Sequence, residues 1–94
     1  MKTILVVDDD PAQRRLFQAA VERHGFRTKT AGDGRSAIAA IASDDDIDLM
    51  LLDLVMPGMT GIEALKDIRI RRPEMPAIVL TVSDDGGNAV THNA

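Results

Sequence analysis

The 94-residue sequence predicts an α/β fold in which parallel strands alternate with helices that cover both faces of one sheet. Three of the four predicted strands are aliphatic runs without polar alternation, which is typical of strands buried inside a parallel sheet. Segments with apolar residues at helical spacing separate the strands, and this alternation indicates βαβ units. Because only 2% of the residues are aromatic, the core is expected to be aliphatic.

The first two elements are a strand over residues 3–7 and a helix that begins at Pro11. The strand is a β-branched and aliphatic run that ends in three aspartates. Asp10 and Pro11 suit the N-cap and the first position of a helix, and Gly25 marks its end. The predicted buried face of this helix consists of Leu16, Phe17, Ala20 and Val21.

The next two elements are an edge strand over residues 26–31 and a short helix. Arg27 and Lys29 alternate with apolar or small residues, as in a strand that is exposed on one side. A glycine-rich turn over residues 32–34 leads into the helix, whose inner face is expected to carry Ala37, Ile38 and Ile41. The polar residues 43–46 are interpreted as a solvated loop.

The second half repeats the pattern. Residues 47–54 form another aliphatic run, a loop over 57–61 follows, and Ile62, Leu65 and Ile68 mark a helix that ends before Pro73. Residues 76–82 predict the fourth strand. After a polar loop over 83–88, residues 89–94 are interpreted as the start of a further helix, with little amphipathic signal to support it.

Composition excludes several classes of protein. The net charge of −4 argues against nucleic-acid binding by this segment, because phosphate contacts need a positive face. No run approaches the roughly 20 apolar residues of a membrane span, and the first apolar run is too short for a signal peptide. The absence of cysteine excludes disulfides and thiolate metal sites. We expect one cytoplasmic domain over residues 1–94 that contacts neither membrane nor nucleic acid.

Acidic and hydroxyl residues lie at the carboxyl ends of three predicted strands. Asp8 and Asp9 end the first strand, Asp53 lies near the end of the third, and Thr81 and Ser83 close the fourth. Ligands of open α/β sheets bind at this edge. Three converging carboxylates repel one another unless a cation offsets their charge, and oxygen ligands without His or Cys select Mg²⁺, Ca²⁺ or Mn²⁺ over zinc. The sequence therefore predicts a Mg²⁺ site.

Three segments resemble the signatures of the response-regulator receiver family. They are residues 4–10 (ILVVDDD), 51–61 (LLDLVMPGMTG) and 78–81 (IVLT), in the expected order and at strand ends. The resemblance implies a flavodoxin-like doubly wound parallel sheet with strand order 2-1-3-4(-5). Because residues 1–94 are expected to hold (βα)4 of a complete (βα)5, we interpret them as a receiver domain that is incomplete at its C-terminus.

The resemblance also implies a role for each site residue. Asp53 would be the phosphoacceptor that takes a phosphoryl group from a sensor histidine kinase or a phosphotransfer protein. Asp9 and Asp53 would bind Mg²⁺ directly together with the Val55 backbone carbonyl, Asp8 would bind it through water, and Thr81 would be the switch hydroxyl. A carboxylate is a competent covalent acceptor, and Mg²⁺ neutralises charge on the transferring group. Such a signalling module performs self-phosphorylation and autodephosphorylation only, so it is not expected to be an enzyme.

The sequence departs from the family pattern near its C-terminus. The family carries a lysine at the end of a fifth strand, whereas the lysines here are Lys2, Lys29 and Lys66. There is also no tyrosine to act as the family's aromatic switch residue. We therefore expect residues 77–82 to form an uncovered sheet edge, with a homodimer formed through this edge or through the following helix.

The sequence is also compatible, to different degrees, with three alternatives to a phosphoacceptor. A pseudo-receiver that binds proteins without phosphorylation is favoured by the missing lysine and opposed by Asp53 and Thr81. A Mg²⁺-dependent phosphohydrolase also uses an aspartyl nucleophile, but 94 residues leave no room for its substrate cap. Flavin mononucleotide binding is opposed by the three aspartates of the first loop, because they would repel the phosphate.

Overall fold

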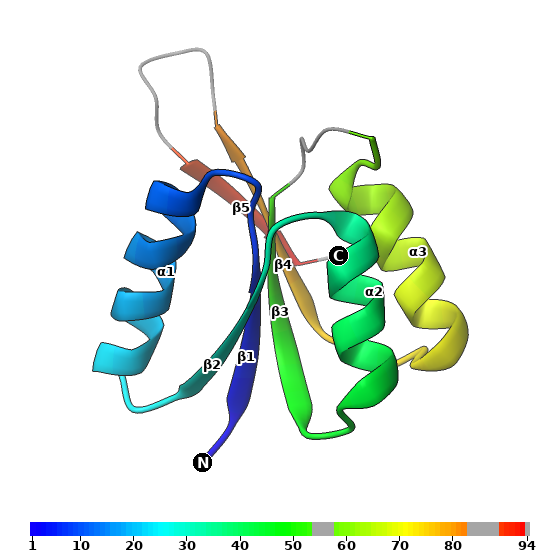
Figure 1. The fold of residues 1–94 in the computed structure, drawn as a ribbon, viewed down its shortest axis with the longest axis horizontal. Coiled ribbons are helices and arrows are strands. Elements are labelled where there is room, and N and C mark those ends of the chain that lie inside the picture. The colour runs from blue at the N-terminus through cyan, green and yellow to red at the C-terminus, as the bar shows by residue number, and fades with distance from the viewer. Residues whose placement is uncertain (54–57, 83–88, 94) are drawn as a thin grey trace.

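A computed structural model of the chain describes residues 1–53, 58–82 and 89–93, with the backbone alone at 81–82 and 89–93. One sheet carries helices on both faces, α1 on one and α2 and α3 on the other (Figure 1). The elements are β1 (Thr3–Val7), α1 (Pro11–Arg23), β2 (Arg27–Ala31), α2 (Gly34–Ser43), β3 (Ile47–Asp53), α3 (Gly61–Arg71), β4 (Ala77–Val82) and β5 (Ala89–Asn93).

The strands lie in the order β2-β1-β3-β4-β5. The first four are mutually parallel, so the predicted flavodoxin-like α/β fold with strand order 2-1-3-4 is confirmed. β1 lies between β2 and β3, and all five of its residues are buried. Within the described part of the chain, no helix has the length and hydropathy to span a membrane.

Local capping explains where the helices begin. The Asp10 carboxylate accepts a hydrogen bond from Ala12 N at 3.0 Å, with Pro11 in the first turn of α1. The Asp33 carboxylate accepts from Ser36 N at 2.7 Å at the start of α2. α3 begins with a capping box in which Thr60 and Glu63 bond each other's backbone N–H groups.

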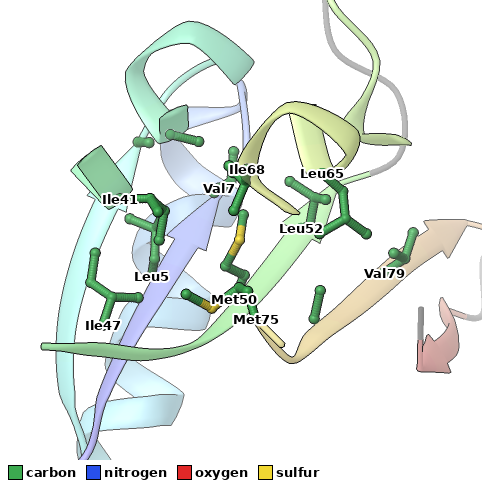
Figure 2. Packing of buried hydrophobic residues seen from close by; sticks show 13 residues of the cluster. Leu5, Val7, Ile41, Ile47, Met50, Leu52, Leu65, Ile68, Met75 and Val79 are labelled. Carbon is green, nitrogen blue, oxygen red and sulfur yellow. The ribbon is translucent and has the colours of Figure 1, made fainter. Parts of the chain in front are cut away.

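The main core lies between the sheet and the pair of helices α2 and α3 (Figure 2). It is aliphatic apart from thioether sulfurs, in agreement with the composition. Alternate residues of β1 and β4 point into it, as the two-residue period of a strand requires. In β3, Met50 and Leu52 follow the same period, and Ile47 also joins the core, on the other side of a register shift between β1 and β3. Its larger members are Leu5, Val7, Ile41, Ile47, Met50, Leu52, Leu65, Ile68, Met75 and Val79.

The opposite face of the sheet is covered less completely. α1 packs on β1 and β2, and none of its residues is fully buried. The prediction that Leu16 and Ala20 face inward is wrong, because the Leu16 side chain is 72% exposed and Ala20 is exposed as well. Leu51 in β3 and Ile78 in β4, on the same face, are half-buried. Helical spacing identifies a face of a helix, but it does not tell how far the neighbouring sheet extends beneath it.

The C-terminal segment differs from its prediction. Residues 89–93 form β5, antiparallel to β4, and do not start a helix. A parallel strand needs a crossover of about a dozen residues, whereas the short connection over 83–88 suffices for an antiparallel return. β4 is therefore not an uncovered edge, and the surface through which a homodimer was expected is occupied by β5.

Candidate metal site

The carboxyl ends of β1 and β3 bring the acidic residues together. The two strands are adjacent and parallel, and Val7 pairs with Leu52. Asp8 and Asp53 follow these paired residues, so they leave the sheet side by side at the same edge. Asp9 is the next residue along the turn toward α1. Adjacent strand ends are where open α/β sheets bind ligands.

The three carboxylates lie within reach of one ion. One oxygen from each of Asp8, Asp9 and Asp53 lies within 4.8 Å of the others. Two oxygens bound to one Mg²⁺ at about 2.1 Å are at most about 4.2 Å apart. A small rotation of one side chain would bring the oxygens within this distance. Alternatively, one carboxylate could bind the ion through a water molecule. The donor set, which is oxygen only, fits a hard divalent cation.

Burial differs along this set. Asp8 is 2% exposed, Asp53 is half-buried and Asp9 is exposed. An ion held here would therefore contact protein on one side and water on the other. This suits Mg²⁺, which keeps several of its water ligands when it binds to proteins.

Asp8 is held by hydrogen bonds from three directions. Its carboxylate accepts from Asp10 N at 2.9 Å, and its own backbone N–H donates to Ala31 O at 3.1 Å. Its backbone carbonyl accepts from Arg14 Nη1 at 2.8 Å. The turn that carries Asp8 and Asp9 is thereby tied to both β2 and α1.

Burial raises the pKa of the Asp8 carboxyl above its ordinary value. The negative charges of Asp9 and Asp10 raise this pKa further, whereas the hydrogen bond from Asp10 N–H and the charge of Arg14 lower it. A desolvated carboxylate beside like charges favours its neutral form. A cation bound beside Asp8 would instead favour the charged form of its carboxyl. Electrostatics therefore favour the binding of a cation at this site.

Asp53 lies against the N-terminus of α3. A Cβ atom on Gly61 would lie 2.2 Å from the Asp53 backbone oxygen, so only glycine fits at this point. Sequence reasoning assigned Gly61 to a loop and missed this contact. A signal was present, because glycine is a poor helix former and is used where another group must approach the backbone closely.

The remaining predicted site residues are described only in part. Asp53 pairs with Leu80, which places the backbone of Thr81 at the same edge of the sheet, one residue further on. The Thr81 side chain is not among the described atoms. Val55 and Ser83 fall in the segments 54–57 and 83–88, outside the described residues. Their assigned roles stay predictions.

The acidic cluster over residues 44–46 lies apart from this site. It precedes β3, at the amino end of the strand that carries Asp53 at its carboxyl end. Asp44 forms an ion pair with Lys29 and accepts a hydrogen bond from Asp46 N at 2.9 Å. Its interpretation as a solvated loop agrees with the exposure of Asp45 and Asp46.

Comparison with known proteins identifies the family. The family described as the response regulator receiver domain matches residues 4–93. The probable transcriptional regulatory protein TcrX of Mycobacterium tuberculosis is 40% identical over 82 residues, which are 87% of this chain and 35% of that protein. The chain therefore spans about a third of the length of this curated relative.

Solved structures agree with this assignment. The chemotaxis protein CheY4 of Vibrio cholerae superposes with a TM-score of 0.84 at 31% identity, over 92% of this chain and 72% of that one. The response regulator TrrA of Thermotoga maritima, solved in complex with Mg²⁺-BeF, gives a TM-score of 0.76 at 37% identity, over 84% and 66%. The chain belongs to the family of response regulator receiver domains.

Proposed function

We propose that the chain is the phosphoacceptor domain of a two-component response regulator, in which Asp53 receives a phosphoryl group from a sensor histidine kinase. The convergence of Asp8, Asp9 and Asp53 carries this proposal. Two structures of TrrA support it. One is its complex with Mg²⁺-BeF, and the other its complex with the histidine kinase ThkA, which matches this chain with a TM-score of 0.81 at 36% identity.

The proposed reaction transfers phosphorus from nitrogen to oxygen. A carboxylate oxygen of Asp53 attacks the phosphorus of a phosphohistidine, the P–N bond breaks, and the imidazole leaves with the bonding electron pair. Asp53 then holds an acyl phosphate, which water later hydrolyses to carboxylate and phosphate. The module undergoes this chemistry on itself, so we do not class it as an enzyme.

Each residue of the site has a part in this proposal. Asp9, Asp53 and the Val55 carbonyl would hold Mg²⁺ directly, and Asp8 would hold it through water. When bound, Mg²⁺ offsets the negative charge that gathers on the transferring phosphoryl oxygens. Thr81 would donate its hydroxyl hydrogen bond to the new phosphoryl group and draw its loop inward. We place the module in the cytoplasm, where kinase and phosphodonors meet it.

A small phosphodonor tests the proposal without the cognate kinase. The chain is incubated with acetyl phosphate and Mg²⁺, and its intact mass is measured. We expect addition of one phosphoryl group that requires Mg²⁺, is lost in Asp53→Asn and persists in the matched control Asp45→Asn. The yield of phosphorylated chain is expected to be partial, because this sequence has no lysine at the position where the family carries one. Equal mass addition in Asp53→Asn would refute the assignment. No addition to the wild type under any condition would favour the pseudo-receiver.

The phosphorylated form is expected to decay slowly. Val55 lies two residues after Asp53 in the sequence, and an apolar side chain at this position would order no attacking water. The same mass measurement, repeated over time after removal of the donor, gives the lifetime. A lifetime of seconds would contradict this expectation.

A further inference from the structure

We propose that Arg14 is a positioning residue that fixes the Asp8–Asp9 peptide group and thereby sets the spacing of the metal-binding carboxylates. The magnesium part of this inference rests on the proposed function. The positioning itself does not, because it can be measured on the metal-free chain.

The Arg14 side chain spans the turn between β1 and α1. Arg14 lies in the first turn of α1, and its backbone N–H donates to Asp10 O at 2.9 Å. Its Nη1 donates to Asp8 O at 2.8 Å. Arg14 therefore makes two hydrogen bonds from the helix to the backbone of this turn. The Asp8 carbonyl belongs to the peptide group that joins Asp8 to Asp9. Rotation of this peptide group changes ψ of Asp8 and φ of Asp9, so holding it restricts the positions from which both side chains leave the backbone.

Gly32 provides the space that the Arg14 guanidinium occupies. A Cβ atom on Gly32 would lie 3.2 Å from Arg14 Nη1. The φ angle of Gly32 is not positive, so alanine would meet no backbone strain at this position. The missing side chain at Gly32 thus serves the fit of Arg14. The neighbouring Ala31 carbonyl accepts the Asp8 N–H at 3.1 Å, so the end of β2 holds this corner from the other side.

Charge and geometry predict opposite effects of Arg14 on metal binding. As a positive charge near the site, Arg14 repels a divalent cation, so its removal would tighten Mg²⁺ binding. As the group that orients the Asp8–Asp9 peptide, its removal would weaken binding. Outer partners of metal ligands typically contribute about 10- to 100-fold in affinity. We therefore expect geometry to prevail.

The test combines four variants with a calorimetric Mg²⁺ titration. Arg14→Gln is expected to weaken Mg²⁺ binding about tenfold. Arg14→Lys keeps the charge and one donor, and should recover part of this loss. Gly32→Ala should weaken binding about threefold, because the guanidinium must shift by a few tenths of an ångström to make room for the methyl group. The neighbouring Arg15 is exposed, and Arg15→Gln, which removes the same charge, should bind Mg²⁺ at least as tightly as the wild type.

A double variant isolates the contact. In Arg14→Gln the space beside Gly32 is open, so adding Gly32→Ala to it should cause no further loss of affinity. An equal effect of Gly32→Ala with and without Arg14 would overturn the inference. So would Mg²⁺ binding by Arg14→Gln that is unchanged or tighter.

The metal-free chain gives an independent readout. By NMR, the Asp8 and Asp10 amides should exchange faster with solvent in Arg14→Gln than in the wild type and in Arg15→Gln, because the turn loses its tie to α1. Unchanged exchange would overturn the positioning role. If the wild type binds no Mg²⁺, the proposed function fails, whereas the exchange data still decide the role of Arg14.

Discussion

The buried carboxylate of Asp8 destabilises the metal-free fold, although it belongs to the proposed Mg²⁺ site. Its charge is desolvated and lies beside Asp9 and Asp10, which are both negative. Protein groups stabilise it through the Asp10 N–H group and Arg14, but they do not remove the repulsion. Sites that bind cations commonly carry this cost while empty, and a neutral substitution then stabilises the fold at the expense of function.

Asp8→Asn is expected to stabilise the fold and to weaken Mg²⁺ binding. The asparagine oxygen can still accept the hydrogen bond from Asp10 N, while the buried charge is lost. We expect the melting temperature to rise by about 4–8 °C, which corresponds to roughly 1 kcal/mol for a domain of this size. The control Asp45→Asn removes an exposed charge and should change the melting temperature by less. Thermal unfolding at neutral pH without metal measures both, and a lower melting temperature for Asp8→Asn would contradict the account.

The same advantage should depend on pH. Below the ordinary Asp pKa of 3.8, the carboxyl is protonated in the folded and unfolded chain alike. As the pH rises above this value, the unfolded chain loses its proton first, because the folded pKa is raised. Ionisation then favours unfolding until the pH passes the folded pKa. The stability gain of Asp8→Asn should therefore be small at low pH, grow through this window and stay constant above it. A gain independent of pH would exclude the charge as its cause.

At the scale of elements, the N-terminus of α3 joins helix stability to the site. Thr60 and Glu63 cap the helix through exposed hydrogen bonds, while Gly61 touches the Asp53 backbone. The cap acts on the helix alone. The glycine acts on the position of the proposed phosphoacceptor as well.

Two neighbouring substitutions separate these effects. Thr60→Ala should cost about 1 kcal/mol of unfolding free energy, as loss of a cap typically does, and leave Mg²⁺ affinity unchanged. Gly61→Ala should cost more, about 2–4 kcal/mol, because backbone must move to relieve the contact. It should also weaken Mg²⁺ binding, since Asp53 is displaced. Denaturant unfolding and metal titration give both quantities, and unchanged Mg²⁺ affinity in Gly61→Ala would contradict the coupling.

Elements with local signals could be predicted from the sequence. The side chains of Asp10, Asp33 and Thr60 each accept a hydrogen bond from a backbone N–H within three residues. The start of each helix therefore depends on a short segment of sequence. The exposure of Leu16 and the strand at residues 89–93 depend on neighbours distant in sequence. The roles of Arg14 and Gly32 likewise required the turn and the end of β2 to meet.

At the scale of the whole molecule, the topology assembles the site. The carboxyl ends of parallel strands share one edge, so the approach of Asp8 and Asp9 to Asp53 followed from the predicted sheet alone. The last strand did not follow, because residues 89–94 are interpreted from the sequence as the start of a helix. Its direction also differs from that of the parallel fifth strand that the family pattern implies. Chain direction at a sheet edge depends on the length of the connection and not on the strand's own residues.

A cation that binds only the folded chain should stabilise the whole domain. At a Mg²⁺ concentration of about 100 times Kd, the gain is about 2.7 kcal/mol. We expect the melting temperature to rise with Mg²⁺ in the wild type and to respond much less in Asp53→Asn. Sodium at matched ionic strength controls for screening of the net charge of −4. An equal response of wild type and Asp53→Asn would mean that the ion binds elsewhere.

The position of the cation is the most direct test of the central claim, that one ion binds among Asp8, Asp9 and Asp53. Mn²⁺ takes similar oxygen ligands and broadens NMR signals near it. On addition of substoichiometric Mn²⁺ to the chain, we predict that the backbone amide signals of these three residues broaden first and that excess Mg²⁺ restores them. Broadening centred on residues 44–46, or spread evenly over the acidic surface, would contradict the account.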